Sequence, residues 1–284
     1  MNAPAYRVRV AFQGEPGAFS EEAAIQLLGP GVETVARPTF ESLFRAVDDG
    51  AADVLLAPLE NSLAGSVTRV YDLLVKSDLV LTAETILRIE HHLIGCAGAT
   101  LSGIRSVESH PMALAQCDRF LTARPPRRRV AAEDTAGSVR EVLRRGDPTC
   151  AAIAGRRAAE IYCGVILEGN IEDAAENYTR FALLSCAPAR DPSANKMTLV
   201  VRLAHLPGAL HHALGPFARR GLNLLKIESR PIHGCPWEYR FFLDVEAAPE
   251  PDLAEAVEEL RGVAQDVRVL GCYVAAHPPK AATA

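Results

Sequence analysis

The sequence predicts a two-lobed α/β domain followed by a smaller α+β module with the βαββαβ order of a ferredoxin-like fold. First, apolar strand-like runs alternate with helical patterns from residue 6 to about residue 186, which is typical of mostly parallel sheets with helices on both faces. Second, the pattern changes after a proline-containing stretch at 188–195 that has the composition of a linker. A chain of 284 residues also has the length of two ordinary domains.

The first domain, residues 1–187, is expected to contain nine strands, which suggests two lobes with a cleft between them rather than one large sheet. The first lobe should comprise residues 1–80 and 165–187, and the second lobe residues 81–164. Strands are predicted at 6–12, 32–36, 53–58, 79–87, 91–96, 104–108, 129–132, 150–153 and 165–167. Helices are predicted at 18–28, 40–49, 66–75, 111–122, 135–145 and 155–162.

The second module, residues 196–275, shows period-two and helical patterns in the order strand, helix, strand, strand, helix, strand. The alternation is clearest in the third strand, where Tyr239, Phe241, Leu243 and Val245 alternate with the charged residues Arg240 and Asp244. The tail, residues 276–284, is expected to be disordered. The six elements are predicted at 197–204, 208–220, 222–229, 239–245, 253–263 and 267–274.

Composition argues against several classes of partner. The net charge of −5 and the pI of about 5.9 speak against nucleic acid and anionic membranes. No apolar run approaches the ~18–20 residues of a membrane span, and the first residues do not form a signal peptide, so a cytoplasmic protein is expected. Seven cysteines without a C-x-x-C pair, and histidines that occur as the adjacent pairs His91-His92 and His211-His212, predict no disulfide framework and no metal centre.

Two polar motifs lie at the ends of apolar strand-like runs. In open α/β sheets, ligands bind at the ends of the strands. Glu60, Asn61 and Ser62 follow one such strand, and Asn177, Thr179 and Arg180 precede another. A helix cap could explain Ser62. It explains Glu60 and Asn61 less well, because a buried polar group without a partner is costly. The motifs therefore favour a functional cleft.

Three further motifs open helices. Gly14-Glu-Pro-Gly17-Ala-Phe-Ser20 follows the first strand and could present backbone N–H groups to an anion, or could be a plain turn. Its glycine spacing fits neither a dinucleotide fingerprint nor a P-loop. Ser109-His110-Pro111 suits the start of a helix, which leaves Gln116 unexplained, and Asp134-Thr135-Ala136 suits an N-cap.

Taken in order, these motifs resemble those of prephenate dehydratase over nearly the whole chain, and the C-terminal module resembles the family's regulatory ACT domain. One departure is Met112, where the family usually has glutamine. The motifs are Gln13-Gly-x-x-Gly17-x-x-Ser20, Glu60-Asn-Ser62-x-x-Gly65, Ser109-His-Pro111 with Gln116, Asp134-Thr-Ala136, Asn177-x-Thr-Arg-Phe181, Gly208-Ala-Leu210 and Asn223-Leu-Leu-Lys-Ile-Glu228-Ser-Arg-Pro231.

The resemblance implies lobes like those of a periplasmic binding protein and a reaction in which prephenate loses CO₂ and its ring hydroxyl to give phenylpyruvate, without a cofactor. It implies that Thr179 donates to the departing hydroxyl. It implies that four further residues assist catalysis or orient the substrate: Glu60, Asn61, Ser109 and Gln116. Six others would bind the substrate: Gly14, Gly17, Ser20, Ser62, Arg180 and Phe181.

The resemblance also implies allosteric control by L-phenylalanine, bound between paired ACT modules of a homodimer or homotetramer. The implied effector residues are Gly208, Ala209, Leu210, Asn223, Glu228, Ser229 and Arg230. Two rival interpretations stay open at this point. One is a non-catalytic two-lobed sensor of small molecules, because fold alone does not decide function, and the other is an arogenate dehydratase, which performs the same reaction on the amino analogue.

Overall fold

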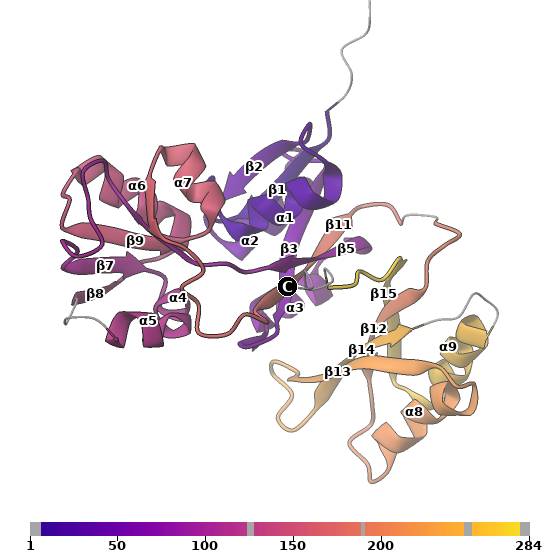
Figure 1. Ribbon diagram of the computed structural model, residues 1–284. Helices are drawn as coiled ribbons and strands as arrows, with labels where there is room; N and C mark the ends of the chain where they lie inside the picture. Colours follow the sequence, from indigo (N-terminus) through magenta and orange to yellow (C-terminus); the bar gives the residue numbers. More distant parts are fainter. Residues whose placement is uncertain (1–6, 124–127, 189–190, 247–251, 279–284) are drawn as a thin grey trace, which may run out of the picture. The chain divides into compact units, whose positions relative to one another are not determined.

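The structure is a computed structural model that describes residues 7–123, 128–188, 191–246 and 252–278. The chain forms two compact units (Figure 1). The first unit runs to Leu73 and includes Thr85–Phe181, and the second contains Leu74–Glu84 and Ala182–Ala276. Each unit is described by itself below.

The first lobe of the first unit is built on a sheet whose strands follow the order β5-β11-β3-β1-β2, with the short β4 paired to β3. The central strand β1 runs parallel to both β2 and β3, and its Val10 and Ala11 are fully buried. The strands are β1 (Arg9–Gln13), β2 (Glu33–Arg37), β3 (Val54–Asn61), β4 (Gly65–Ser66), β5 (Val80–Arg88) and β11 (Tyr178–Ser185), and the helices are α1 (Phe19–Leu28), α2 (Phe40–Asp48) and α3 (Thr68–Lys76).

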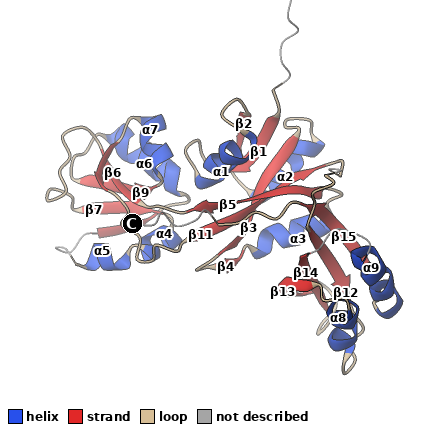
Figure 2. Cartoon of the chain, turned by 45° about the vertical axis from the view of Figure 1, so that its right-hand side comes forward, coloured by secondary structure: helices blue, strands red, loops and turns tan. Residues whose placement is uncertain are grey.

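The second lobe has a five-stranded sheet in the order β10-β6-β9-β7-β8. Helices α6 and α7 pack on one face of this sheet, and α4 and α5 pack on the other (Figure 2). Each pair of helices covers a separate apolar cluster. The strands are β6 (His92–Gly95), β7 (Ser106–Ser109), β8 (Arg128–Ala131), β9 (Cys150–Ala154) and β10 (Val165–Glu168), and the helices are α4 (Pro111–Gln116), α5 (Asp118–Thr122), α6 (Thr135–Arg145) and α7 (Arg156–Tyr162).

The predicted α/β class and the two lobes are confirmed, but each predicted lobe boundary is displaced by one strand. Strand β5 lies in the first sheet, next to β11, although residues 81–87 were assigned to the second lobe. Strand β10 pairs with β6 of the second sheet, although residues 165–167 were assigned to the first lobe. An apolar run identifies a strand but carries no information about which sheet edge it joins.

Two elements also differ in length from their predictions. The helix predicted at 111–122 is broken at Cys117, which has φ −118° and ψ 25°. The break leaves the carbonyl of Gln116 to accept a hydrogen bond from the backbone of Asp173, at 2.7 Å. Strands β3 and β11 are longer than their apolar runs, because Glu60, Asn61, Thr179 and Arg180 lie inside the strands rather than beyond them.

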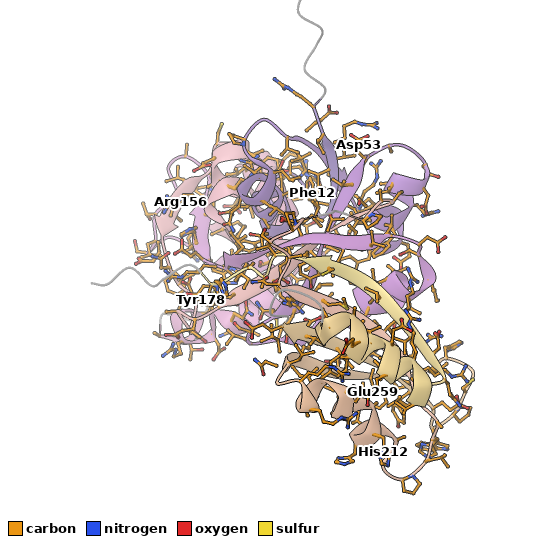
Figure 3. The ribbon with its side chains drawn as sticks, turned by 90° about the vertical axis from the view of Figure 1, so that its right-hand side faces the viewer. Phe12, Asp53, Arg156, Tyr178, His212 and Glu259 are labelled. Carbon is orange, nitrogen blue, oxygen red and sulfur yellow. The ribbon has the colours of Figure 1, made fainter. Side chains whose placement is uncertain are left out.

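The second unit contains the predicted βαββαβ module. Its strands follow the order β13-β14-β12-β15. Figure 3 labels His212 on α8 and Glu259 on α9. Arg220, the C-cap of α8, links the two helices through an ion pair with Glu259 at 2.7 Å. Leu199, Val201 and Phe217 belong to the buried core. The elements are β12 (Lys196–Arg202), α8 (Ala209–Arg219), β13 (Asn223–Pro231), β14 (Tyr239–Glu246), α9 (Asp252–Val263) and β15 (Asp266–Tyr273).

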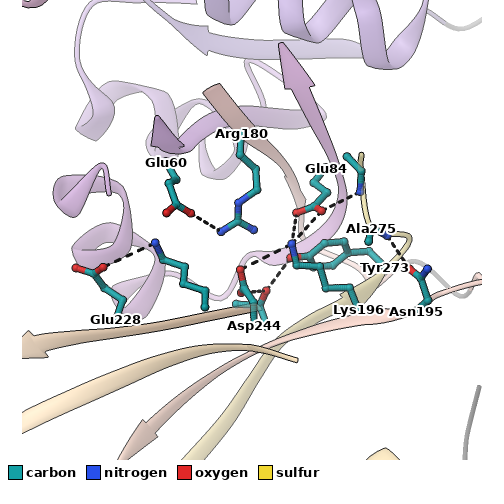
Figure 4. A network of polar contacts seen from close by, with 12 residues as sticks. Glu60, Glu84, Arg180, Asn195, Lys196, Glu228, Asp244, Tyr273 and Ala275 are labelled. Carbon is teal, nitrogen blue, oxygen red and sulfur yellow. Dashed lines mark hydrogen bonds and ion pairs between the residues drawn. The ribbon is translucent and has the colours of Figure 1, made fainter. Parts of the chain in front are cut away.

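A buried polar cluster lies on the other face of β12 (Figure 4). Lys196 is 4% exposed, and its Nζ lies 3.0 Å from both carboxylate oxygens of Glu84 and 3.8 Å from Asp244 Oδ2. Asp244 Oδ1 accepts a hydrogen bond from the Thr198 hydroxyl at 2.7 Å. Buried charges are tolerated only when they are paired and hydrogen-bonded, and the strands supply that pairing here.

The ends of the second module bear on two predictions. Ala276, the first residue of the tail expected to be disordered, donates its backbone N–H to Glu84 Oε1 at 2.9 Å. Residues 279–284 of that tail and residues 189–190 of the predicted linker lie outside the described residues. Within the described ranges, no helix has both the length and the apolarity needed to span a membrane.

Candidate active site

A cavity of about 410 Å³ lies within the first unit. Gln13, Ser20, Asn61 and Thr179 line it from the first lobe, and His91, Gln116 and Asp134 line it from the second-lobe side. The sequence therefore predicted correctly that Asn61, Gln116 and Thr179 would come together, although they lie far apart along the chain.

Asn61, the last residue of β3, has its amide direction fixed by the main chain. Its Oδ1 accepts hydrogen bonds from the backbone N–H groups of Leu63 and Ala64, at 3.0 and 2.9 Å. Because these groups can only donate, Nδ2 must face the other way. There it donates to Thr179 Oγ1 at 2.9 Å and to Asn177 Oδ1 at 2.8 Å.

The Asn177 amide, oriented by Asn61, in turn orients the amide of Gln116. Asn177 is fully buried, and its Nδ2 donates to Gln116 Oε1 at 3.1 Å. With its oxygen held on this side, the Gln116 amide nitrogen is left to face the cavity that the residue lines. The cavity wall therefore presents an N–H donor at Gln116.

Thr179 presents a second donor. Its oxygen already accepts from Asn61, so its proton must point elsewhere, and the described residues supply no hydrogen-bond acceptor for it. Thr179 is 9% exposed and lines the cavity. Two donors aimed into the cavity suit a group that gains negative charge, such as a departing hydroxide or a carboxylate.

The glycine-containing loop does not offer the amides that the sequence predicted. The N–H of Gly14 donates to the carbonyl of Arg37 at 2.9 Å, and the N–H of Gly17 donates to Glu21 Oε2 at 2.8 Å. Both N–H groups are therefore already used, and neither is free for an anion in this structure. Gly14 itself lines the cavity, so its contact with substrate stays a prediction. Ser20 does line the cavity, from the first turn of α1.

Glu21 joins the loop to the second lobe. Its carboxylate accepts from Gly17, from Thr34 Oγ1 at 2.8 Å and from Arg157 Nε of α7 at 2.7 Å. Burial alone would raise the pKa of Glu21, but the hydrogen bonds from Arg157, Gly17 and Thr34 outweigh it and the pKa is lowered. A Cβ at Gly17 would overlap the backbone of Ala158 in α7, so glycine is required where the lobes meet.

Glu60 and Arg180 pair with each other rather than line the cavity. Arg180 Nη2 lies 3.5 Å from Glu60 Oε2 (Figure 4), and neither residue belongs to the cavity wall. Successive residues of a strand point to opposite faces, so Arg180 must point away from the side that Thr179 occupies. The predicted contacts of Arg180 and Glu60 with substrate are therefore not supported by the structure.

Three other predicted residues also have structural partners outside the cavity wall. The Ser109 hydroxyl is fully buried and donates to the carbonyl of Ile153 at 2.6 Å. The Ser62 hydroxyl donates to the carbonyl of Glu176 and accepts from the backbone of Tyr178, both at 2.9 Å. Phe181 is 2% exposed and belongs to the core. The two hydroxyls therefore bond to the backbone and Phe181 packs in the core, and the roles toward substrate that the sequence predicts for these residues stay predictions.

Sequence reasoning missed His91, Phe19 and Glu133, which all line the cavity. The signal available in the sequence was the position of the polar His91 between two apolar strands, β5, which ends at Arg88, and β6, which begins at His92. Asp134 caps α6 as predicted, with Gly137 donating to its carboxylate at 2.5 Å. It also lines the cavity.

A smaller cavity of about 120 Å³ lies in the second unit, between the start of α8 and strand β14. Ala209, Leu210, Tyr239 and Phe241 line it, and Gly208 is the N-cap of α8 with φ 81°. Of the predicted effector residues, Ala209 and Leu210 therefore reach the cavity. On β13, Ser229 is paired in register with Phe241 of the cavity wall.

Asn223 lies away from this cavity within the chain. It pairs in register with Glu246 at the far end of the β13–β14 ladder, about 20 Å along the strand from Ser229. Its Nδ2 donates to Glu246 Oε2 at 3.2 Å. One chain therefore does not bring Asn223 together with Ala209 and Leu210.

Two family models match the chain: residues 10–189 match "Prephenate dehydratase" and residues 197–264 match "ACT domain". The bifunctional chorismate mutase/prephenate dehydratase of Neisseria gonorrhoeae is 38% identical over 266 residues, covering 93% of this chain and 74% of that protein. Arogenate dehydratase/prephenate dehydratase 2 of Arabidopsis thaliana, a chloroplastic protein, is 39% identical over 280 residues, covering 94% and 73%.

Among solved structures, the prephenate dehydratase of Arthrobacter aurescens in complex with L-Phe superposes with a TM-score of 0.86 and 32% identity. The match covers 94% of this chain and 90% of that one. The similarity therefore extends over both units in sequence.

Proposed function

This chain belongs to the prephenate dehydratase family, and we propose that it converts prephenate into phenylpyruvate in the biosynthesis of L-phenylalanine. The observation that carries the proposal is the Thr179 hydroxyl on the cavity wall, with its oxygen held by Asn61 and its proton left for a ligand. We assign catalysis to residues 1–187 and regulation to residues 196–275.

In the proposed reaction, the bond from the ring to the carboxylate breaks and its electron pair enters the ring. The ring becomes aromatic as the C–O bond breaks, and the oxygen leaves with the electrons of that bond. Hydroxide is a poor leaving group, so the Thr179 hydroxyl donates to this oxygen and water departs with CO₂. Solvent returns the proton to Thr179. Aromatisation supplies the driving force, and the balance requires no oxidant, reductant or cofactor.

The two substrate carboxylates meet neutral donors in this cavity. No lysine or arginine occurs among the described residues that line it, whereas Gln13, Ser20, Gln116 and Thr135 do. A firm ionic hold on the carboxylate that leaves as CO₂ would stabilise the ground state more than the transition state and would slow the reaction. Weak neutral contacts therefore suit decarboxylation.

We assign control by L-phenylalanine to the second unit, because the relative from Arthrobacter aurescens is described in complex with L-Phe. Asn223 is too distant from Ala209 and Leu210 within one chain, so the effector site would combine these residues from two copies. Strand β13 ends the sheet among the described strands and exposes Leu225 and Ile227, each 47% exposed. We therefore propose a homodimer or homotetramer. Seven cysteines without a disulfide are consistent with the cytoplasmic location that we propose.

An arogenate dehydratase is the second candidate, because relatives of similar identity carry that name. Glu133 on the cavity wall is a feature that would favour the ammonium group of arogenate over the keto group of prephenate. The alternative of a non-catalytic sensor predicts binding without turnover.

One assay separates these functions. The purified protein is given prephenate or arogenate, and formation of phenylpyruvate or phenylalanine is followed with and without added phenylalanine. We expect turnover of prephenate, with a rate that changes when phenylalanine is added. Turnover of arogenate alone would establish the second candidate, and binding without product would establish the sensor. A rate that phenylalanine leaves unchanged would contradict the regulatory role.

A further inference from the structure

We infer that His91 is a positioning residue that fixes the direction of the Gln116 amide by donating a hydrogen bond to its oxygen. The inference rests on the proposed function and deepens it, because it gives a residue outside the expected motifs a task in the same site. His91 follows β5, is 2% exposed and lines the cavity. Its Nε2 lies 2.9 Å from Gln116 Oε1.

The direction of this hydrogen bond follows from the amide chain described above. The backbone N–H groups of Leu63 and Ala64 fix Asn61, Asn61 fixes Asn177, and Asn177 presents its Nδ2 to Gln116. The atom of Gln116 that faces both Asn177 and His91 is therefore the oxygen. An oxygen accepts, so His91 Nε2 must carry a proton.

Burial also favours the neutral form of the His91 imidazole. Burial lowers the pKa of His91, and this effect exceeds the opposing influence of Gln116 and of the Glu172 carboxylate. Glu172 Oε2 accepts from the backbone N–H of His91, at 2.9 Å. The ring also makes an edge contact with Phe19, with centroids 5.6 Å apart. A neutral ring protonated at Nε2 has a lone pair at Nδ1.

Packing alone does not account for a histidine at this position. Its Nδ1 is buried and has no hydrogen-bond partner among the described residues, which is unfavourable for a polar atom. A leucine or phenylalanine would fill the space without that cost. Without the donor at Nε2, Gln116 would lose one of two groups that hold its oxygen, and its amide could rotate so that the oxygen faces an anionic substrate.

Three substitutions test the donor. His91→Gln keeps an amide nitrogen at the ε position, whereas His91→Asn places its polar atoms only at the δ position and His91→Leu has none. We expect His91→Leu and His91→Asn to lower kcat/KM for prephenate by about threefold to tenfold, the usual weight of one hydrogen bond, and His91→Gln to restore it. The matched control is His92→Leu, because His92 is 1% exposed but lies off the cavity wall. We expect it to leave kcat/KM unchanged.

Two further readouts separate positioning from general stability. In a Gln116→Ala background, His91→Leu should lower kcat/KM no further, since the group that it orients is gone. Nitrogen-15 NMR of labelled histidine should show His91 neutral with its proton on Nε2, with the signal assigned by its loss in His91→Gln. A proton on Nδ1, or an equal loss of kcat/KM in both backgrounds, would overturn the inference. A wild-type protein without turnover would count against the proposed function, while the NMR result would still decide the protonation of His91.

Discussion

Replacing Thr179 with valine is expected to lower kcat for prephenate on the order of 10²–10⁴-fold, the usual weight of positioned acid catalysis. Valine has the shape of threonine but cannot donate to the departing oxygen. Binding of prephenate should change little, because Thr179 is one neutral group on a wall that has several others. Phenylpyruvate formation measures kcat, and calorimetric titration with prephenate measures binding.

Two matched variants control this result. Thr179→Ser keeps a hydroxyl that Asn61 can hold and should retain much of the activity. Thr85→Val removes a buried hydroxyl that lies off the cavity wall and accepts from Gln26 Nε2, so it should leave kcat at the wild-type value. If folded Thr179→Val turned over prephenate as fast as wild type, Thr179 would have no part in the chemistry.

The second large effect is expected for stability. Lys196→Met removes the buried ammonium that lies between Glu84 and Asp244 (Figure 4). Removing one partner of a buried ion pair typically costs about 3–5 kcal/mol. We expect the free energy of unfolding of the second unit to fall by that amount. Differential scanning calorimetry measures it, with the transitions resolved separately, because a two-unit protein need not unfold in one step.

Lys76→Met is the control for this substitution. Lys76 is an exposed lysine of α3 in the same unit, and its loss should change the free energy of unfolding by no more than about 0.5 kcal/mol. The double variant Lys196→Met with Glu84→Leu should lose less than Lys196→Met alone, because it removes a buried carboxylate together with its cation. An unchanged transition in Lys196→Met would show that the cluster contributes nothing to stability.

Most of the fold could be predicted from the sequence, because apolar periodicity and caps are local signals. The strand at 239–245 and the helix at 135–145 were predicted within a residue or two of their bounds. Sheet membership is set by pairing between distant strands, so the places of β5 and β10 were wrong. The break at Cys117 leaves the carbonyl of Gln116 to the backbone N–H of Asp173, which lies more than fifty residues further along the chain, and a local pattern does not show such a partner.

The candidate site was predicted in location but not in the directions of its side chains. Asn61, Gln116 and Thr179 do meet, whereas Arg180 faces away because it follows Thr179 in a strand. The N–H groups of Gly14 and Gly17 suit an anion in a sequence motif, but their use by Arg37 and Glu21 is visible only in three dimensions. The direction of a hydrogen bond depends on which groups the folded chain brings together, and the sequence alone does not show these partners.

The kcat of the Asn61→Asp variant is the measurement that tests the direction of these hydrogen bonds most directly. The new carboxylate would still accept from Leu63 and Ala64, but it would face Thr179 with an oxygen in place of an N–H donor. Thr179 would then donate to that carboxylate instead of to the ligand, so kcat should fall to the level of Thr179→Val. Asn170→Asp, which adds the same charge at an exposed position off the cavity wall, should match wild type. A wild-type kcat for Asn61→Asp would contradict the proposed role of Thr179 as a donor oriented by Asn61.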